Sequence, residues 1–273
     1  MEAVILAGGP IPPALQGATD APERALIALE GRALIDHVLD SLRGVPPITG
    51  IVCVAPPATL AHLPSDVRGL ESGDKVTENL FKGARAAQGE RILIVTGDVP
   101  LATGRTWMQF LDGAAVNLIE AAYPIVSREK CEEQFPGGTR TYAPLKEGQF
   151  TGGNAFLLPR AHLETLESLI SQAFAARKNP FALARLVGAG PGFIAKALAK
   201  RLTIDEVEKK VSRLIGCRAG AVPIPDAAIA FDIDKQSDLD TAARVLRERG
   251  KDGGLDPCGP APLRPNPTST QKR

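Results

Sequence analysis

The chain begins with the run Ala3-Val4-Ile5-Leu6-Ala7, which is followed directly by Gly8-Gly9. A short apolar run that ends at glycines is typical of a buried strand with a turn after it. The next apolar residues, over positions 34–42, recur with helical spacing and form one stripe, so we expect a helix there. A strand followed by a helix is therefore the opening unit of the chain.

The same alternation continues through the first hundred residues. Apolar runs at 48–55 and 91–96 predict two further strands, and the spacing over 75–87 predicts a helix between them. These strands are apolar on both faces, which is typical of parallel strands covered by helices on both sides. The sequence thus predicts an α/β fold with three layers, built on a mostly parallel twisted sheet of the Rossmann-like kind.

The second half of the chain mixes strands and helices. We expect helices at 106–111, 163–175, 204–215 and 238–249, and strands at 117–126, 140–145, 155–158 and 228–233. The helix at 204–215 has Thr203 and Glu206 in the spacing of a capping box, and Gly216 follows its last residue. From residue 251 the chain is rich in Pro, Gly and Thr without an apolar period, so we expect one domain over 1–250 and a disordered tail over 251–273.

The composition excludes several classes of function. With 32 Lys+Arg and 31 Asp+Glu, the 273 residues carry a net charge of +1, so no general basic field would attract nucleic acid or an anionic membrane. No apolar segment reaches the length of a membrane span or of a signal peptide. Four cysteines and three histidines are scattered, without the spacing of a zinc site. We therefore expect a reduced cytoplasmic protein, whose oligomeric state the sequence leaves open.

Three motifs carry side chains or backbone that could do chemistry. Gly8-Gly9 would let the backbone approach a ligand phosphate, or would only form a tight strand exit with positive φ. Asp98, at the end of the strand expected at 91–96, would hold a divalent cation or cap the next helix. Asp232 and Asp234, two residues apart at the end of the strand expected at 228–233, would share one face and favour a cation between them, or would belong to the turn that begins the next helix.

Taken in order, these pieces resemble the MobA-like NTP transferases, which are nucleotidyltransferases of the GT-A-type fold. The resemblance covers roughly residues 1–247 and involves six segments, none of them specific alone. They are Val4-Ile5-Leu6-Ala7-Gly8-Gly9, Arg24-Ala25-Leu26-Ile27 with Gly31-Arg32-Ala33-Leu34-Ile35, Glu78-Asn79-Leu80 with Gly83, Gly97-Asp98-Val99-Pro100, Gly152-Gly153-Asn154-Ala155-Phe156, and Asp232-Ile233-Asp234.

The resemblance implies a mechanism and a set of site residues. It implies transfer of a nucleoside monophosphate from a nucleoside triphosphate to a small phosphorylated acceptor, with Mg²⁺ as cofactor and pyrophosphate as the second product. An attacking phosphate oxygen needs no side-chain nucleophile, in keeping with a chain that shows no Ser/His or Cys/His arrangement. The implied residues are Arg24 and Asp98 for catalysis; Leu6, Ala7, Gly8, Gly9 and Asn79 for the nucleotide; Gly152, Gly153 and Asn154 for the acceptor in a smaller mixed region; and Asp98 and Asp234, with Asp232 as a further partner, for the metal.

Two of these assignments have plainer alternatives, and one segment departs from the family pattern. Asn79 would otherwise be an ordinary residue at the start of a helix, and the Gly152–Asn154 segment an ordinary β-turn. Most family members have Ser or Thr and then Arg soon after the glycines, with a Lys before the Ala-Leu pair. This chain has Pro10-Ile11-Pro12-Pro13-Ala14-Leu15-Gln16 and Arg24 instead. Two alternatives stay open. The Asp-x-Asp triplet suggests a glycosyltransferase that uses a nucleotide sugar. The altered loop suggests a catalytically weakened nucleotide-binding or regulatory protein.

Overall fold

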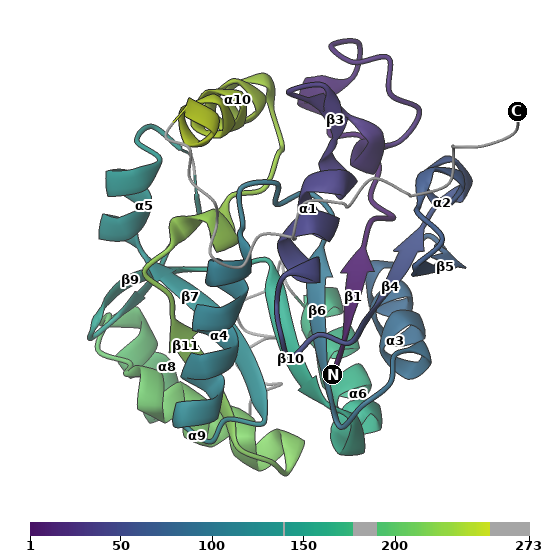
Figure 1. The fold of residues 1–273 in the computed structure, drawn as a ribbon. Coiled ribbons are helices and arrows are strands. Elements are labelled where there is room, and N and C mark those ends of the chain that lie inside the picture. The colour runs from purple at the N-terminus through teal and green to yellow at the C-terminus, as the bar shows by residue number, and fades with distance from the viewer. Residues whose placement is uncertain (139, 177–189, 252–273) are drawn as a thin grey trace, which may run out of the picture.

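A computed structural model of the chain describes residues 1–138, 140–176 and 190–251. Its centre is a nine-stranded sheet with helices on both faces (Figure 1). The strands are β1 (Glu2–Leu6), β4 (Gly50–Ala55), β5 (Val67–Glu71), β6 (Arg91–Thr96), β7 (Ala121–Ser127), β8 (Ala143–Leu145), β9 (Gly148–Gly152), β10 (Ala155–Pro159) and β11 (Ala219–Pro223). A separate hairpin is formed by β2 (Ala28–Leu29) and β3 (Arg32–Ala33).

The sheet has the order β5-β4-β1-β6-β10-β7-β9-β8, and β11 pairs with β7. The pairs β5·β4, β4·β1, β1·β6 and β7·β11 are parallel, while β10 and β9 run opposite to their neighbours. The sheet is therefore parallel on the side of the first strands and mixed on the other side. This confirms the expected fold class.

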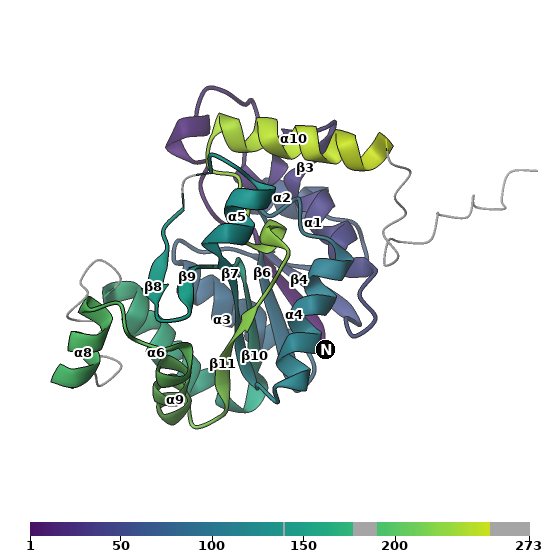
Figure 2. The ribbon, with the colours of Figure 1, turned by 90° about the vertical axis from the view of Figure 1, so that its left-hand side faces the viewer.

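Helices cover both faces of the sheet, as Figures 1 and 2 show from two directions. The described helices are α1 (Leu34–Arg43), α2 (Pro57–His62), α3 (Val76–Ala86), α4 (Gly104–Val116), α5 (Arg128–Gln134), α6 (Leu163–Ala176), α8 (Pro191–Leu198), α9 (Ile204–Ile215) and α10 (Gln236–Lys251). Four short 3₁₀ turns accompany them at Pro13–Leu15, Arg24–Leu26, Arg160–His162 and Ala227–Ala230. No helix within these described ranges is both long enough and apolar enough to cross a lipid bilayer.

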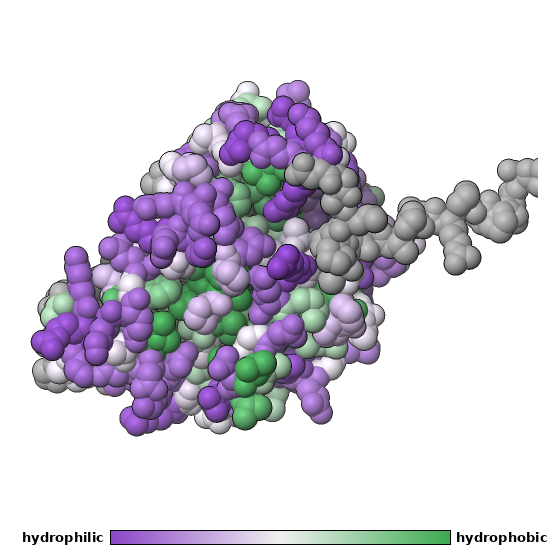
Figure 3. All heavy atoms as spheres, turned by 60° about the vertical axis from the view of Figure 1, so that its left-hand side comes forward, coloured by the Kyte–Doolittle hydropathy of each residue, from purple (hydrophilic) through white to green (hydrophobic). Residues whose placement is uncertain are grey.

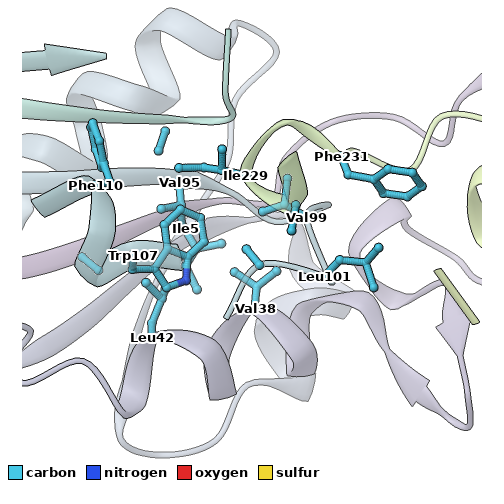
Figure 4. Close-up of a cluster of buried hydrophobic side chains, with 14 of the residues drawn as sticks. Ile5, Val38, Leu42, Val95, Val99, Leu101, Trp107, Phe110, Ile229 and Phe231 are labelled. Carbon is cyan, nitrogen blue, oxygen red and sulfur yellow. The ribbon is translucent and has the colours of Figure 1, made fainter. Parts of the chain in front are cut away.

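Alternate residues of β1 serve two separate hydrophobic cores. Ile5 is buried in the core that contains α1 and α4, where Trp107 and Phe110 pack (Figure 4). Its neighbour Val4 is buried in the other core, against Phe81 of α3. A strand apolar on both faces therefore has a helical layer to pack against on each side. Hydrophilic residues cover most of the surface on the side shown in Figure 3.

Most of the expected elements are present close to their expected bounds. The helix at 204–215 is α9, where Thr203 accepts a hydrogen bond from the Glu206 N–H and Gly216 ends the helix at φ +83°. The helix expected at 106–111 is longer because α4 begins at Gly104, after the N-cap Thr103, and runs to Val116. The tail expected at 251–273 lies outside the described residues from position 252 on, and Lys251 itself ends α10.

The strand expected at 228–233 is wrong. The segment instead forms the 3₁₀ turn Ala227–Ala230, where the Asp226 carboxylate accepts the Ala228 N–H, followed by irregular chain. An apolar run is buried equally well in a strand or in a compact turn, so periodicity alone does not distinguish them. The sheet position beside β7 is taken by β11, which the sequence did not suggest. Also unpredicted were β5, β9, α2, α5 and α8.

Candidate nucleotide and metal site

The ends of β1 and β6 bring the first two motifs together. The two strands are parallel and adjacent, with Leu6 opposite Thr96, so the chain leaves both strands at the same edge of the sheet. There the Gly97 N–H donates to the Leu6 carbonyl at 2.9 Å. The carboxyl edge of parallel strands is where open α/β sheets bind ligands. The Gly8-Gly9 turn and Asp98 therefore lie side by side at the expected position.

A cavity of about 170 Å³ opens at this edge. Its wall includes every residue expected to bind the nucleotide and both residues expected to be catalytic. The lining residues are Leu6, Ala7, Gly8, Gly9, Arg24, Ala25, Val76, Asn79, Thr96, Gly97 and Asp98.

The two glycines have different reasons to be glycine. A Cβ on Gly8 would lie 2.7 Å from Cβ of Ser72, the residue after β5, whereas a Cβ on Gly9 would approach only Arg24, at 3.9 Å. Neither glycine has a positive φ, so the alternative of a strand exit that requires a left-handed conformation is wrong. Gly8 is small because another part of the chain passes close to it. Among the described residues, no hydrogen bond uses the N–H of Gly8 or Gly9, so both donors remain available to a ligand.

The side chain of Asn79 forms hydrogen bonds with the protein's own backbone. Its Oδ1 accepts from the Gly73 N–H at 2.7 Å and its Nδ2 donates to the Gly73 carbonyl at 2.8 Å. It is buried and stands fourth in α3, in the first turn of that helix. Asn79 thus fixes the segment after β5 against the glycine turn. In this arrangement Asn79 lines the cavity while its amide holds the Gly73 backbone in place.

Asp98 and Asp234 meet on one guanidinium nitrogen. Nη2 of Arg24 lies 2.6 Å from Oδ2 of Asp98 and 2.8 Å from Oδ1 of Asp234. The same nitrogen donates to the Ile233 carbonyl at 2.8 Å, and the Ile233 N–H donates to the Asp98 carbonyl at 3.1 Å. The irregular chain after the 3₁₀ turn therefore carries Asp234 to the carboxyl end of β6. The alternative that Asp98 caps the next helix is wrong, because Thr103 is the N-cap of α4.

Asp232 and Asp234 come together differently from the expected pattern. They are not on one face of a strand, because residues 231–235 are irregular. The N–H groups of Asp234 and Lys235 bond to Oδ2 of Asp238, so this segment is also the turn that leads into α10. The alternative of a turn that begins the next helix is therefore correct, and the same turn places Asp234 beside Arg24.

The site has more negative charge than Arg24 can satisfy. Burial raises the pKa of Asp232 to about 6, and the nearby charges of Asp98 and Asp234 act in the same direction. Oδ1 of Asp98 is buried without a hydrogen-bond partner in the described part of the chain, and so is Nε of Arg24. A cation placed among these carboxylates would relieve both the repulsion and the unpaired oxygen.

These residues fit Mg²⁺ when a phosphate completes its ligands. In the described ranges, no group of three or more His, Cys, Asp or Glu side chains is arranged to hold a metal by itself. Mg²⁺ in phosphate sites commonly takes only one or two carboxylates, and its other ligands are phosphate oxygens and waters. Asp98, with its unpaired oxygen, and Asp234, whose side chain is 61% exposed, have the chemistry for that role.

The segment expected to bind the acceptor lies between two cavities. Asn154 accepts the Thr96 N–H at its carbonyl and donates its own N–H to the Ile229 carbonyl, which places it beside Thr96 at the edge of the first cavity. Gly152 instead lines a second, mainly apolar cavity of about 550 Å³ between β7, β10 and α9. A Cβ on Gly152 would overlap the Tyr123 hydroxyl at 1.8 Å. Gly152 therefore has a packing reason to be glycine, and it lines a different cavity from Gly8, Gly9, Arg24 and Asp98.

Sequence reasoning missed the residues that position the known motifs. Ser72 and Gly73 follow β5, a short edge strand with too few apolar residues to be recognised. Glu23 accepts the N–H groups of Ala58 and Thr59 at 3.0 and 2.6 Å, and so fixes the residue before Arg24 to the start of α2. None of these contacts leaves a local pattern in the sequence.

Solved nucleotidyltransferases share this architecture. A 2-C-methyl-D-erythritol 4-phosphate cytidylyltransferase from Thermus thermophilus is 19% identical, with a TM-score of 0.52 over 90% of this chain and 100% of that one. A CMP:2-keto-3-deoxy-manno-octonic acid synthetase solved with CTP is 13% identical, with a TM-score of 0.55 over 91% of this chain and 100% of that one. At such identities these likenesses establish the fold, which is that of nucleotidyltransferases.

The family follows from the sequence itself. The family model of the MobA-like NTP transferase domain matches residues 3–186, and this chain belongs to that family. A hypothetical transferase from Thermus thermophilus is 34% identical, with a TM-score of 0.74, over 88% of this chain and 100% of that one. No curated protein matches this chain.

Proposed function

We propose that the protein is a Mg²⁺-dependent nucleotidyltransferase that transfers a nucleoside monophosphate from a nucleoside triphosphate to a small phosphorylated acceptor. The observation that carries this proposal is the convergence of Asp98 and Asp234 beside the Gly8-Gly9 turn. Backbone donors on one side and carboxylates on the other are what a metal-bound triphosphate requires. Membership in the MobA-like NTP transferase family supports the same reaction class.

The reaction needs positioning and charge more than a reactive side chain. A phosphate oxygen of the acceptor attacks the α-phosphorus of the nucleotide, the bond to the β-phosphate breaks, and pyrophosphate leaves. Asp98 and Asp234 would hold the Mg²⁺, which when bound supplies positive charge to the phosphate oxygens. The N–H groups of Gly8 and Gly9 would bind phosphate oxygens, and the guanidinium of Arg24, which borders the cavity, would add a further positive charge.

The test is pyrophosphate release from a defined panel of substrates. The protein is mixed with Mg²⁺, each of the four nucleoside triphosphates and a set of sugar phosphates, with CTP first because a similar structure contains it. We expect release with one nucleotide and one acceptor, and its loss in the variant Asp98→Asn. Absence of release across the panel, together with absence of nucleotide binding in calorimetry, would exclude this function.

A second candidate is nucleotide binding without efficient catalysis. It is favoured by the loop after Gly9, which contains three prolines and no cation up to Gln16, and which is anchored by Leu15, fully buried in the core. A loop held in this way is poorly suited to close over a triphosphate. Calorimetry separates the two candidates, because this one gives binding of the Mg²⁺-nucleotide without pyrophosphate from any acceptor.

A further inference from the structure

We propose that Arg24 and the catalytic metal ion are alternative occupants of one oxygen cage, and that the phosphates of the nucleotide draw Arg24 out of it. The proposal rests on the metal site of the proposed function. It adds that metal binding depends on whether the nucleotide is bound. Arg24 would bind the phosphates of the nucleotide and in this way make metal binding depend on the nucleotide.

Nη2 of Arg24 has three oxygen neighbours from separate parts of the chain. They are Oδ2 of Asp98 at 2.6 Å, Oδ1 of Asp234 at 2.8 Å and the Ile233 carbonyl oxygen at 2.8 Å. A terminal guanidinium nitrogen has only two hydrogens, so three acceptors are more than it can bond well. Three oxygens directed at one point are instead a partial ligand set for a hard divalent cation.

The rest of the guanidinium is poorly satisfied in the same position. Nε is buried without a partner, and Nη1 has no hydrogen bond to any residue in the described ranges. Nη1 lies 3.9 Å from the place that a Cβ on Gly9 would take, so this nitrogen lies beside the glycine turn. A phosphate bound at Gly8 and Gly9 would offer these donors the oxygens that they lack, in the forked geometry that arginine prefers.

Mutual exclusion turns these contacts into coupling. A metal ion and Nη2 cannot occupy the same point among Oδ2 of Asp98, Oδ1 of Asp234 and the Ile233 carbonyl oxygen, so a metal ion that binds at this point would displace the guanidinium. A nucleotide that binds Arg24 in its displaced position favours the metal-accepting state, and the metal favours nucleotide binding by the same factor. Couplings of this kind are typically about 5- to 150-fold in affinity.

The experiment measures Mn²⁺ affinity by electron paramagnetic resonance, with and without an α,β-methylene nucleoside triphosphate that cannot be cleaved at the α-phosphorus. In the absence of nucleotide we expect Arg24→Gln to bind Mn²⁺ about tenfold more tightly than the wild type, because the competing charge is gone. The nucleotide analogue should strengthen Mn²⁺ binding by a larger factor in the wild type than in this variant. Arg24→Lys, which keeps a positive charge, should stay closer to the wild type.

A matched control and a direct readout complete the design. Arg68→Gln removes an ion pair with Glu2 at the opposite end of β1 and should leave Mn²⁺ affinity unchanged. The ¹⁵N resonance of the Arg24 side chain, identified by its absence in Arg24→Lys, should shift when a diamagnetic divalent ion binds to the wild type. This readout needs no glutamine variant, so the test stands even if Arg24→Gln is unstable.

The possible results distinguish this proposal from the proposed function. The cage proposal is wrong if Arg24→Gln binds Mn²⁺ no more tightly than the wild type, or if the Arg24 resonance does not shift when the metal binds. The proposed function would still hold in that case if pyrophosphate is released. If neither protein binds Mn²⁺ even with the nucleotide analogue, the metal site itself is absent and the proposed function fails with it.

Discussion

Replacement of Gly8 by alanine tests how the glycine turn is built. The new Cβ would lie 2.7 Å from Cβ and 2.9 Å from Oγ of Ser72, and 3.2 Å from Nδ2 of Asn79. Because the closest atom is a Cβ fixed to the backbone, the segment after β5 has to shift as a whole. Overpacking of this kind typically costs about 1–3 kcal/mol of folding free energy. We expect a loss in that range for Gly8→Ala, with nucleotide binding weakened as well because the cavity wall moves.

Gly9→Ala is the matched control. Its Cβ would meet only Arg24, at an ordinary van der Waals distance of 3.9 Å, and its backbone is not left-handed. We expect a stability within about 1 kcal/mol of the wild type, since a glycine replaced without strain loses only unfolded-state entropy. The free energy of unfolding is measured by urea denaturation, with the slope compared between variants so that only the midpoint differs.

A double-mutant cycle identifies the cause of the loss. Ser72→Gly removes the Cβ that Gly8→Ala would strike, so the double variant should recover about 0.5–3 kcal/mol through a favourable coupling energy. Ser72→Ala keeps that Cβ and removes only Oγ, so it should rescue less. The reasoning is refuted if Gly8→Ala is as harmless as Gly9→Ala, or if the two Ser72 changes rescue equally.

Three further predictions concern catalysis, pH and helix capping. Asp98→Asn should reduce pyrophosphate release by about 100-fold or more, with an unchanged circular dichroism spectrum. The raised pKa of Asp232, about 6 against 3.8, means that the folded protein keeps a proton that the unfolded chain has released between about pH 4 and 6. Ionisation of Asp232 therefore lowers the stability of the wild type as the pH rises through that window. The unfolding free energy of Asp232→Asn should rise relative to that of the wild type between pH 4 and 7. An equal difference at both pH values would contradict this prediction. Thr203→Ala should cost about 1 kcal/mol in urea denaturation by removing the α9 cap.

The local patterns predicted the fold well where the period was clear. Ile5 and Val4 lie on opposite faces of β1 as an apolar strand between two helical layers requires, and α9 begins and ends where Thr203 and Gly216 indicate. The prediction failed at residues 228–233, where an apolar run without a clear period forms a 3₁₀ turn. Burial of such a run is fixed by composition, but its backbone conformation is fixed by what it packs against.

The site was predictable in its membership more than in its geometry. The sequence named Asp98, Asp234 and Arg24, and the structure brings them together, although the roles assigned to them remain predictions. It did not show that Gly152 would line another cavity, or that the amide of Asn79 would bond to both backbone groups of Gly73. These are properties of neighbours that the sequence does not place.

The sequence by itself determined most of the succession of strands and helices, the two-sided burial of β1 and the acid after β6, because each depends on residues a few positions apart. Only the tertiary structure decided that Arg24 would stand between Asp98 and Asp234, the latter 210 residues away. Periodicity fixes which face of an element is buried, whereas a contact across such a separation depends on how every intervening element packs. The charge balance of the site, and with it the raised pKa of Asp232, therefore arises only when the whole sheet has formed.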